Sequence, residues 1–375
     1  MKNELSRDLY TEEIFNNICF KEPVEPDSYD SVAEGIKYAM ELDSKSAFLS
    51  GLSERLCQLG VKCTVDDTEI MRKEIKRRFK DILHITCPKP IKNWIRGTTP
   101  GETNRRNNYE LCYALEMDFE ETAIFFQKHF LTIPFNAKSK VDAVFMYSLY
   151  HKKPYSVAAR LLEKSEGFVL KENAHTSTTQ IVSEIYSEDD DDKFLKYLSE
   201  HCYGNEQQFQ LARQIILSEL EITQEDILKY NHSYEDNLSP DRLGSVTIDT
   251  LLGYKYQNKT KRIKKDSLPK RFTESLPNDT TLGKIIRGET ASYELLRKTM
   301  VLLKFYNFYS EADNCDKKNI HSNFMDFRAE LNSSLVSCGF AQLYVCHPFD
   351  CLIMYCANSY EPIDALYCIT ANKGN

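Results

Sequence analysis

The stretch DFEETAIFFQKHF (residues 118–130) constrains the fold most strongly, because it combines a helix start signal with a helical apolar stripe. Asp118 and Glu121 are spaced as a capping box, which satisfies free backbone N–H groups at the first turn of a helix. The apolar residues that follow recur at i, i+4, i+7 and i+11, and so share one side of the helix: Phe119, Ala123, Phe126 and Phe130. We predict an amphipathic helix that buries this stripe in a core.

Similar helical patterns recur along the chain, and the composition agrees with them. Hydrophobic residues make up 42% and aromatic residues 11% of the 375 residues, which excludes a mainly disordered chain. Thirteen glycines and twelve prolines are few for a loop-rich all-β protein. We therefore predict an all-α, multi-helical protein that is long enough for more than one domain.

Changes of pattern divide the chain into five sections. Residues 1–65 form a helical N-terminal section, 66–165 a helical domain, 166–254 a helical middle section, 255–272 a basic linker and 273–375 a helical C-terminal section. In the middle section, the acidic run from Glu188 to Asp192 precedes an apolar helix, where a helix N-terminus favours negative charge. We interpret this run as helix capping, because it lacks the glycine-turned pattern of a calcium loop.

The sequence shows no signal for secretion and no membrane-spanning segment. The first residues, MKNELSRDLYTEEIF, contain no apolar core of signal-peptide length, and no stretch offers about 18 consecutive apolar residues. The twelve cysteines are scattered, and most lie between apolar neighbours, so we expect reduced core residues instead of a disulfide framework. We predict a cytoplasmic protein.

Positive charge is concentrated in two segments, although the net charge of the chain is −8. Residues 70–106 contain eleven basic and three acidic residues, and residues 255–271 contain eight basic and one acidic residue. The rest of the chain therefore carries −23. This partition is typical of a polyanion-binding surface on an acidic protein; the alternative is a solvated helix face with a basic linker.

A short helix that ends in Ile-Arg-Gly occurs twice. In the first copy, KNWIRGTTP, Gly97 stands where a helix C-terminus is capped, and prolines precede the helix. In the second copy, GKIIRGETASYELL, Gly288 takes the same place. Each copy predicts a short helix that ends at a glycine, followed by a loop and a longer apolar helix. The two copies either arose by duplication or match by chance.

The segments IKNWIRGTTP and LCYALEMDFEETAIFF resemble the back half of a lambda-repressor-like (XRE-type) helix-turn-helix domain. The resemblance covers Glu69 to His129 and, more weakly, Leu282 to Phe308. The segment HITCPKP replaces the usual small-residue turn, and the loop from Thr98 to Asn107 is long. The whole chain also resembles large helical proteins of Gram-positive bacteria and their mobile elements that carry degenerate domains of this kind.

The resemblance implies that the helix ending at Gly97 lies in the major groove of duplex DNA. The residues that would face the groove are Lys89, Lys92, Asn93 and Arg96. Phosphate contacts would come from Lys76, Arg77, Arg105 and Arg106. Weaker, secondary contacts would come from Lys261, Arg262, Lys264, Lys265, Lys284 and Arg287. We expect Trp94 and Ile95 to point into the core, with base stacking by Trp94 as the alternative.

No motif in the chain argues for an enzyme, a metal site or a cofactor. CHPFDC (residues 346–351) clusters a thiol, an imidazole and a carboxylate, but its apolar flanks favour a packing role, and no Cys-x-x-Cys pair is present. Glycine-rich phosphate loops, His-Glu-x-x-His and Gly-x-Ser-x-Gly are also missing. We therefore predict no catalytic residues, no metal and no cofactor, although these absences leave an enzyme with a nonstandard site open.

These observations lead to two functional hypotheses. The first is a DNA-binding regulator, or a factor of a mobile element or phage defence system, that contacts duplex DNA through residues 69–106. The second is a helical scaffold that binds another protein and in which the helix-turn-helix remnant is structural. Self-association into a homo-oligomer is open under both.

Overall fold

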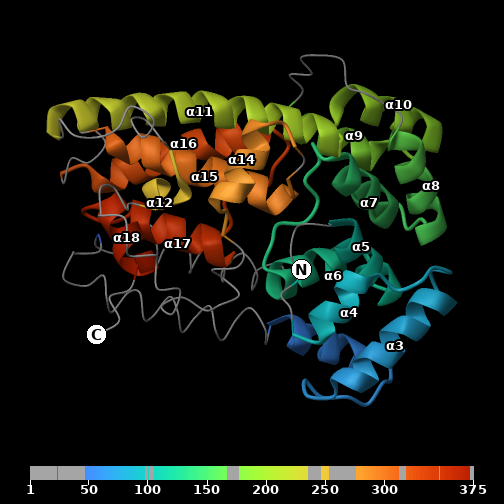
Figure 1. Ribbon diagram of the computed structural model, residues 1–375. Coiled ribbons are helices and arrows are strands. Elements are labelled where there is room, and N and C mark those ends of the chain that lie inside the picture. The colour runs from blue at the N-terminus through green and yellow to red at the C-terminus, as the bar shows by residue number, and fades with distance from the viewer. Residues whose placement is uncertain are drawn as a thin grey trace. The chain divides into compact units, whose positions relative to one another are not determined.

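The computed structural model describes residues 47–97, 105–166, 177–234, 246–252, 276–289, 291–311, 318–345 and 347–371, together with residues 23 and 100. These residues form α-helices, one π-helix and connections, and no strand occurs among them. The prediction of an all-α, multi-helical protein is confirmed (Figure 1). The basic linker at 255–272 and most of the section at 1–65 lie outside the described residues.

The chain divides into two compact units. The N-terminal unit comprises Leu42–Gln208 and Leu335–Gln342. The C-terminal unit comprises Phe209–Ser334 and Leu343–Asn375, together with Met1–Glu41. The N-terminal unit extends past residue 165, where the change of sequence pattern suggested a boundary, because α9 packs against α7 and α10 packs against α8.

The N-terminal unit begins with a helical segment at residues 47–58. The elements that follow are α3 (Thr68–Asp81), α4 (Lys89–Ile95), α5 (Arg105–Ala114), α6 (Phe119–Phe125), the π-helix η3 (Phe126–Phe130), α7 (Lys140–Tyr150), α8 (Tyr155–Glu166), α9 (Thr178–Ser187) and α10 (Asp191–His201). Helix α7 contacts α5, α6, α8 and α9, and nearly all of its side chains are buried. It is therefore the central helix of this unit.

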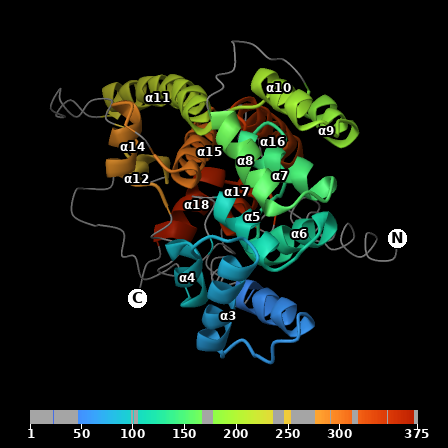
Figure 2. The ribbon, with the colours of Figure 1, turned by 90° about the vertical axis from the view of Figure 1, so that its right-hand side faces the viewer.

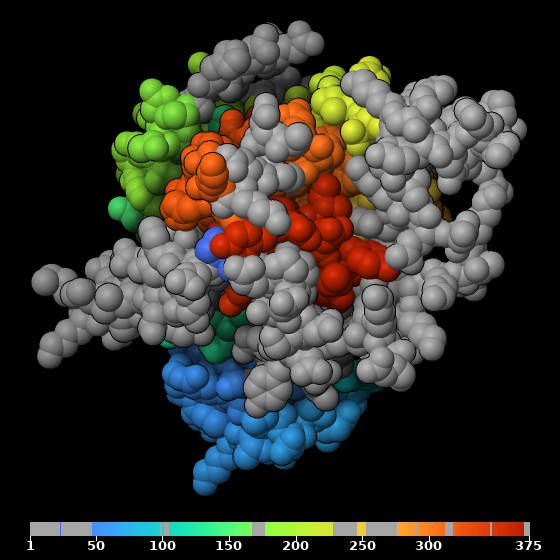
Figure 3. Space-filling model, turned by 90° about the vertical axis from the view of Figure 1, so that its left-hand side faces the viewer, coloured from blue at the N-terminus to red at the C-terminus, as the bar shows by residue number. Residues whose placement is uncertain are grey.

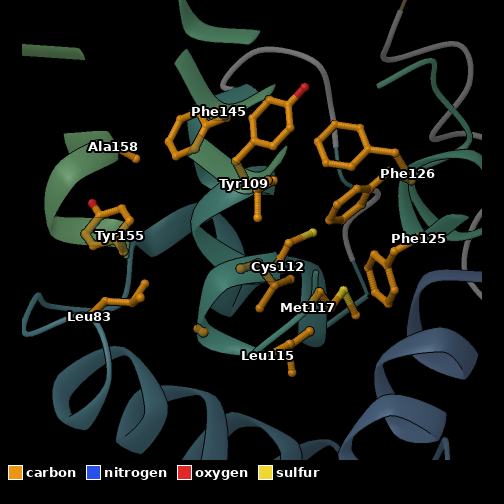
Figure 4. Close-up of a cluster of buried hydrophobic side chains, with 14 of the residues drawn as sticks. Leu83, Tyr109, Cys112, Leu115, Met117, Phe125, Phe126, Phe145, Tyr155 and Ala158 are labelled. Atoms are coloured by element: carbon orange, nitrogen blue, oxygen red, sulfur yellow. The ribbon is translucent and has the colours of Figure 1, made fainter. Parts of the chain in front are cut away.

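Aromatic side chains fill the core between α5 and α7. The ring of Tyr109 lies 4.6 Å from that of Phe126 and 4.7 Å from that of Phe145, centroid to centroid. Figure 4 shows these rings together with Cys112 and Phe125. All five side chains are buried, and burial of such apolar surface is the main stabilising contribution to a helical core.

Local sequence signals start the helices of this unit where they were expected. The Asp118 side chain accepts a hydrogen bond from the Glu121 backbone N–H at 2.8 Å, and the Glu121 side chain accepts one from the Asp118 N–H, so the capping box is confirmed. Asp190 caps α10 by accepting bonds from the backbone N–H groups of Asp192 and Lys193. The acidic run is therefore a helix cap, as the sequence predicted.

The face that α3 buries differs in part from the one expected. The sequence spacing of Ile70, Ile75, Phe79 and Ile82 predicts one apolar side for this helix, but Ile70 and Ile82 are 44% and 38% exposed. The buried side chains are Met71, Ile75 and Phe79, which recur every four residues, and Leu83 continues that row. The row fits one side of a 3.6-residue helix, and Ile70 and Ile82 lie off it.

The C-terminal unit is built from α11 (Asn205–Tyr234), α12 (Ile248–Leu251), α14 (Asp279–Ile286), α15 (Tyr293–Ser310), α16 (Ile320–Ser337), α17 (Pro348–Ala357) and α18 (Pro362–Ala371). The first residues of α11 and the last of α16 are grouped with the N-terminal unit. Helix α15 is buried on almost every side and contacts α12, α14, α17 and α18. Orange and red segments of this unit adjoin one another at the surface in Figure 3.

The apolar C-terminal section is divided between α16 and α17, with Gly339 and Pro348 in and after the connection between them, and α17 packs against α18. Among the described residues, no helix is both long enough and apolar enough to cross a membrane.

The two Ile-Arg-Gly copies have similar local structures. Gly97 follows α4 with φ at 106°, and Gly288 follows α14 with φ at 76°. Each short helix packs against the next longer one, α5 or α15.

Candidate nucleic-acid interface

Helix α4 has one apolar side and one polar side. Pro88 caps it and Pro90 occupies its first turn, where a missing N–H costs nothing. Its apolar side buries Ile91, Trp94 and Ile95. Trp94 is 5% exposed and packs edge-on against Phe48 and Phe130, with ring centroids at 6.0 and 6.1 Å. The expected core role of Trp94 and Ile95 is confirmed.

The polar side of α4 brings together the four residues predicted to face DNA. Lys89, Lys92, Asn93 and Arg96 stand at i, i+3, i+4 and i+7, which is one side of a helix. Lys89 and Arg96 are exposed, and Lys92 and Asn93 are half-buried. Within the described part of the chain, none of these three cationic groups forms an ion pair. Their charge is therefore available to a ligand.

Helix α3 presents a second row of basic side chains with the same spacing. Lys73, Lys76, Arg77 and Lys80 stand at i, i+3, i+4 and i+7, and all are exposed. Arg77 is held by Glu74 at 2.6 Å and by Asp81 at 3.3 Å. The three lysines have no carboxylate partner among the described residues. Lys73 and Lys80 were not predicted as DNA contacts. The sequence signal that could have identified them is their helical spacing relative to Lys76 and Arg77.

The buried thiol of Cys87 interacts electrostatically with one lysine of each row. Burial raises the pKa of Cys87 to about 11, and the ammonium groups of Lys92 and Lys76 oppose this rise. Lys76 of α3 and Lys92 of α4 are therefore both close to Cys87, in agreement with the packing of α3 against α4 (Figure 2). We use the term basic face for the side chains that make up the two rows: Lys73, Lys76, Lys80, Lys89, Lys92, Asn93 and Arg96.

Arg105 lies inside the N-terminal unit, away from solvent. Its guanidinium donates to Asp142 Oδ2 at 2.8 Å and to the Ile133 carbonyl at 2.8 Å. Arg105 is 6% exposed and Asp142 is fully buried. The Tyr109 hydroxyl also donates to this carboxylate. A guanidinium committed to a buried carboxylate cannot reach a phosphate, so this placement argues against the contact predicted for Arg105.

Arg106 is partly exposed, but it too has an acidic partner. Its Nε lies 2.8 Å from Glu110 Oε1, which also accepts a hydrogen bond from the Tyr155 hydroxyl at 2.8 Å. Glu110 is buried, so Arg106 compensates a buried charge. Like Arg77, Arg106 contributes little free positive charge to the surface.

The secondary residues belong to a different part of the chain. Lys284 and Arg287 are exposed at the end of α14 in the C-terminal unit, and Arg287 is paired with Glu289 at 2.7 Å. Lys261, Arg262, Lys264 and Lys265 lie outside the described residues. Among the predicted contacts, the structure brings together those on α3 and α4.

The CHPFDC segment supplies two members of a buried ionic cluster whose other members are on α15. Asp350 accepts two hydrogen bonds from Arg297, at 2.8 and 2.7 Å, and one from the Tyr344 N–H at 2.9 Å. Arg297 and Asp350 are 2% and 1% exposed. Lys298 pairs with Glu294 at 2.6 Å. The packing role proposed for this segment is thus an electrostatic one.

His347 lies between the two carboxylates of this cluster. Its Nδ1 is 3.4 Å from Asp350 Oδ1 and its Nε2 is 3.6 Å from Glu294 Oε1. Burial alone would lower the pKa of His347, but Asp350 and Glu294 raise it to about 9. The two carboxylates therefore favour the protonated form of the imidazole. Sequence reasoning missed this cluster because Arg297 lies some fifty residues from the motif.

The described residues contain no group of three or more His, Cys, Asp and Glu side chains arranged to hold a metal ion. Comparisons of the chain with protein-family models, with curated protein sequences and with solved structures found no match. The helix-turn-helix resemblance remains a prediction from the sequence.

Proposed function

We propose that the protein binds duplex DNA through the basic face. The observation that carries this proposal is the pair of lysine-rich rows on the packed helices α3 and α4, which have no carboxylate partner among the described residues. Cationic side chains of this kind release counterions from the phosphate backbone, which is the main source of affinity for DNA.

The chemistry of the basic face suits a duplex better than a single strand. Proteins that bind single strands stack bases on exposed aromatic rings. The one tryptophan of the chain is buried in the core, and among the side chains whose burial the structure describes, Tyr150 of α7 is the only exposed aromatic one. The basic face therefore offers cations and one amide, which suit phosphates and groove edges.

The finer proposal keeps α4 as the element that enters the major groove. Arg96 would donate to guanine and Asn93 would pair with adenine, while the lysines of α3 would contact phosphates. Residues 82–88 between α3 and α4 form a longer connection than the three or four residues of a standard helix-turn-helix. A regulator, or a factor of a mobile element or defence system, is the biological role that fits this proposal.

The test is a binding comparison between two charge-matched variants. The first replaces Lys76, Lys89, Lys92 and Arg96 with alanine. The control replaces exposed lysines elsewhere in the N-terminal unit with alanine: Lys62, Lys128, Lys193 and Lys196. Both variants lose four positive charges, so the change in net charge is equal and only the location differs.

The assay is fluorescence anisotropy with a labelled 30-base-pair duplex in 100 mM salt. Each lost phosphate contact should lower the logarithm of the binding constant by about 0.9, so we expect the basic-face variant to bind at least a hundredfold more weakly. The control should bind within about threefold of the wild type. Equal losses in both variants, or no loss in the first, would refute the assignment. Circular dichroism spectra of the two variants check that both remain folded.

A scaffold role is the second candidate, and the exposed apolar side chains around α3 favour it. Val65, Ile70 and Ile82 are 42%, 44% and 38% exposed. Exposed apolar side chains that gather on one element are typical of a protein contact. Sedimentation velocity at rising concentration tests the simplest case, a second copy of this chain. A dimer that is lost on changing all three residues to serine supports this role, and a concentration-independent monomer opposes it.

A further inference from the structure

Two buried lysines flank the start of α7 in the N-terminal unit. Lys138 is 8% exposed and Lys140 is 4% exposed, which is rare for lysine. Between them, Ser139 has an extended backbone, with φ at −86° and ψ at 126°. Residues i and i+2 of an extended segment point to the same side. The two lysine side chains therefore leave the chain in the same direction.

A short β-bridge places the starts of two helices side by side at this point. The Tyr203 N–H donates to the Lys138 carbonyl at 2.7 Å, and the Lys140 N–H donates to the Tyr203 carbonyl at 2.9 Å. Lys140 is the first residue of α7, and α11 begins at Asn205, two residues after Tyr203. Each helix N-terminus carries about half a positive charge. Two such ends therefore lie beside the two lysines.

The lysine side chains extend toward the segment that leads into α11. The Lys138 ammonium lies 5.8 Å from the centroid of the Tyr203 ring. The Lys140 ammonium donates to the Ser165 carbonyl at 3.3 Å and lies 3.9 Å from the position that a Cβ of Gly204 would occupy. Because Gly204 has no side chain, the backbone there is open to a close approach.

Among the described residues, Lys138 has no anionic partner. Its ammonium forms no hydrogen bond or ion pair with any described residue. Cys202, which lies near both lysines, offers no compensation, because burial raises the pKa of its thiol to about 12 and keeps it neutral. Burial lowers the pKa of both Lys138 and Lys140. The charge of Lys138 therefore has no counter-charge among the described residues, which favours a ligand that supplies one.

We propose that Lys138, Lys140 and the adjoining N-termini of α7 and α11 bind a phosphate group. Lysine ammonium groups and helix N-termini are the standard protein partners of phosphate, and two cations with two helix ends match a dianion better than a single carboxylate. The phosphate is either free inorganic phosphate or the phosphate of a nucleotide, because both present the same oxygens. The site shares no residue with the basic face.

The test uses the full chain and the single tryptophan as a reporter of the N-terminal unit. Thermal unfolding is followed by Trp94 fluorescence at fixed ionic strength, with chloride replaced by phosphate or by adenosine monophosphate. A ligand that binds only the folded state raises the melting temperature with its concentration. We expect phosphate, the nucleotide or both to raise it relative to chloride.

Three variants assign the effect to the site. Lys138→Met keeps the apolar stem and removes the charge, so it should weaken phosphate binding at least about tenfold and raise the melting temperature in chloride alone. Lys138→Arg keeps the charge and should keep the response if it folds. Lys128→Met, at an exposed lysine of η3, should behave as the wild type.

Each outcome decides the proposal. A response to inorganic phosphate that Lys138→Met loses supports a free anion, and one limited to the nucleotide supports a nucleotide phosphate. The alanine variant of the basic face should retain the response, which separates this site from binding of phosphate to the basic face. No difference between phosphate, nucleotide and chloride, or an undiminished response in a folded Lys138→Met, overturns the proposal.

Discussion

Replacing Arg105 with methionine should destabilise the N-terminal unit without weakening DNA binding. The guanidinium donates to Asp142 and to the Ile133 carbonyl, and Asp142 is fully buried. Removal of Arg105 leaves that carboxylate with the Tyr109 hydroxyl as its remaining side-chain partner among the described residues. Breaking a buried ion pair from one side costs about 3–5 kcal/mol. For a unit of this size, we expect the melting temperature to fall by about 6–20 °C.

Urea unfolding followed by Trp94 fluorescence measures this loss, because the only tryptophan lies in the core of the same unit. The control is Arg160→Met, which breaks an exposed ion pair with Asp191 at 2.6 Å and should cost about 0–1 kcal/mol. The double variant Arg105→Met, Asp142→Leu should regain most of the lost stability, because both charges are then gone. These comparisons separate loss of the buried pair from loss of an arginine.

The reasoning fails if Arg105→Met costs no more than Arg160→Met. It also fails if Arg105→Met, measured at a temperature where it is folded, binds duplex DNA many-fold more weakly than the wild type. The second result would restore the phosphate contact predicted from the sequence.

Two further predictions concern stability. The pKa of His347 is about 9 in the folded protein and near 6.5 in the unfolded chain. Protonated His347 therefore stabilises the folded protein fully below pH 6.5. This contribution to the free energy of unfolding, at most about 3 kcal/mol, is lost as pH rises toward 9. Urea unfolding by circular dichroism at pH 6.5 and pH 9.5 should show this fall, and His347→Gln should reduce it; an identical fall in the variant contradicts the assignment. Gly97→Ala should cost about 1–3 kcal/mol by Trp94 fluorescence, because φ at 106° strains any L-residue, and an unchanged stability would contradict this.

The sequence predicted the features that depend on neighbouring residues. The capping box at Asp118, the cap at Asp190 and the burial of Trp94 follow from spacing within one or two turns, and the structure confirms all three. The i, i+3, i+4, i+7 spacing of Lys89, Lys92, Asn93 and Arg96 likewise fixed their common side of α4.

Features that depend on distant partners could not be predicted in this way. Arg105 stands in a basic run, but its environment is set by Asp142, 37 residues later. Asp350 is compensated by Arg297, 53 residues earlier. No periodic pattern encodes such pairs, because tertiary packing brings them together. The exposure of Ile70 also depends on tertiary packing. The side of α3 that carries Met71, Ile75 and Phe79 faces the core, and Ile70 lies off that side.

The lysines of the proposed phosphate site illustrate the same limit. Lys138 and Lys140 look like ordinary surface residues in the sequence. Only the bridge between Ser139 and Tyr203, 64 residues apart, shows that they are buried beside a second helix start.

The salt dependence of DNA binding tests the central claim most directly. The affinity of the wild type for a duplex, measured between 50 and 300 mM salt, should fall linearly on logarithmic axes with a slope of roughly −4 to −5, which is about −0.9 for each cation of the basic face in contact with a phosphate. The Lys76, Lys89, Lys92, Arg96 alanine variant should have a slope shallower by about 3. Absence of binding at 50 mM salt, or the same slope in both proteins, would contradict the claim.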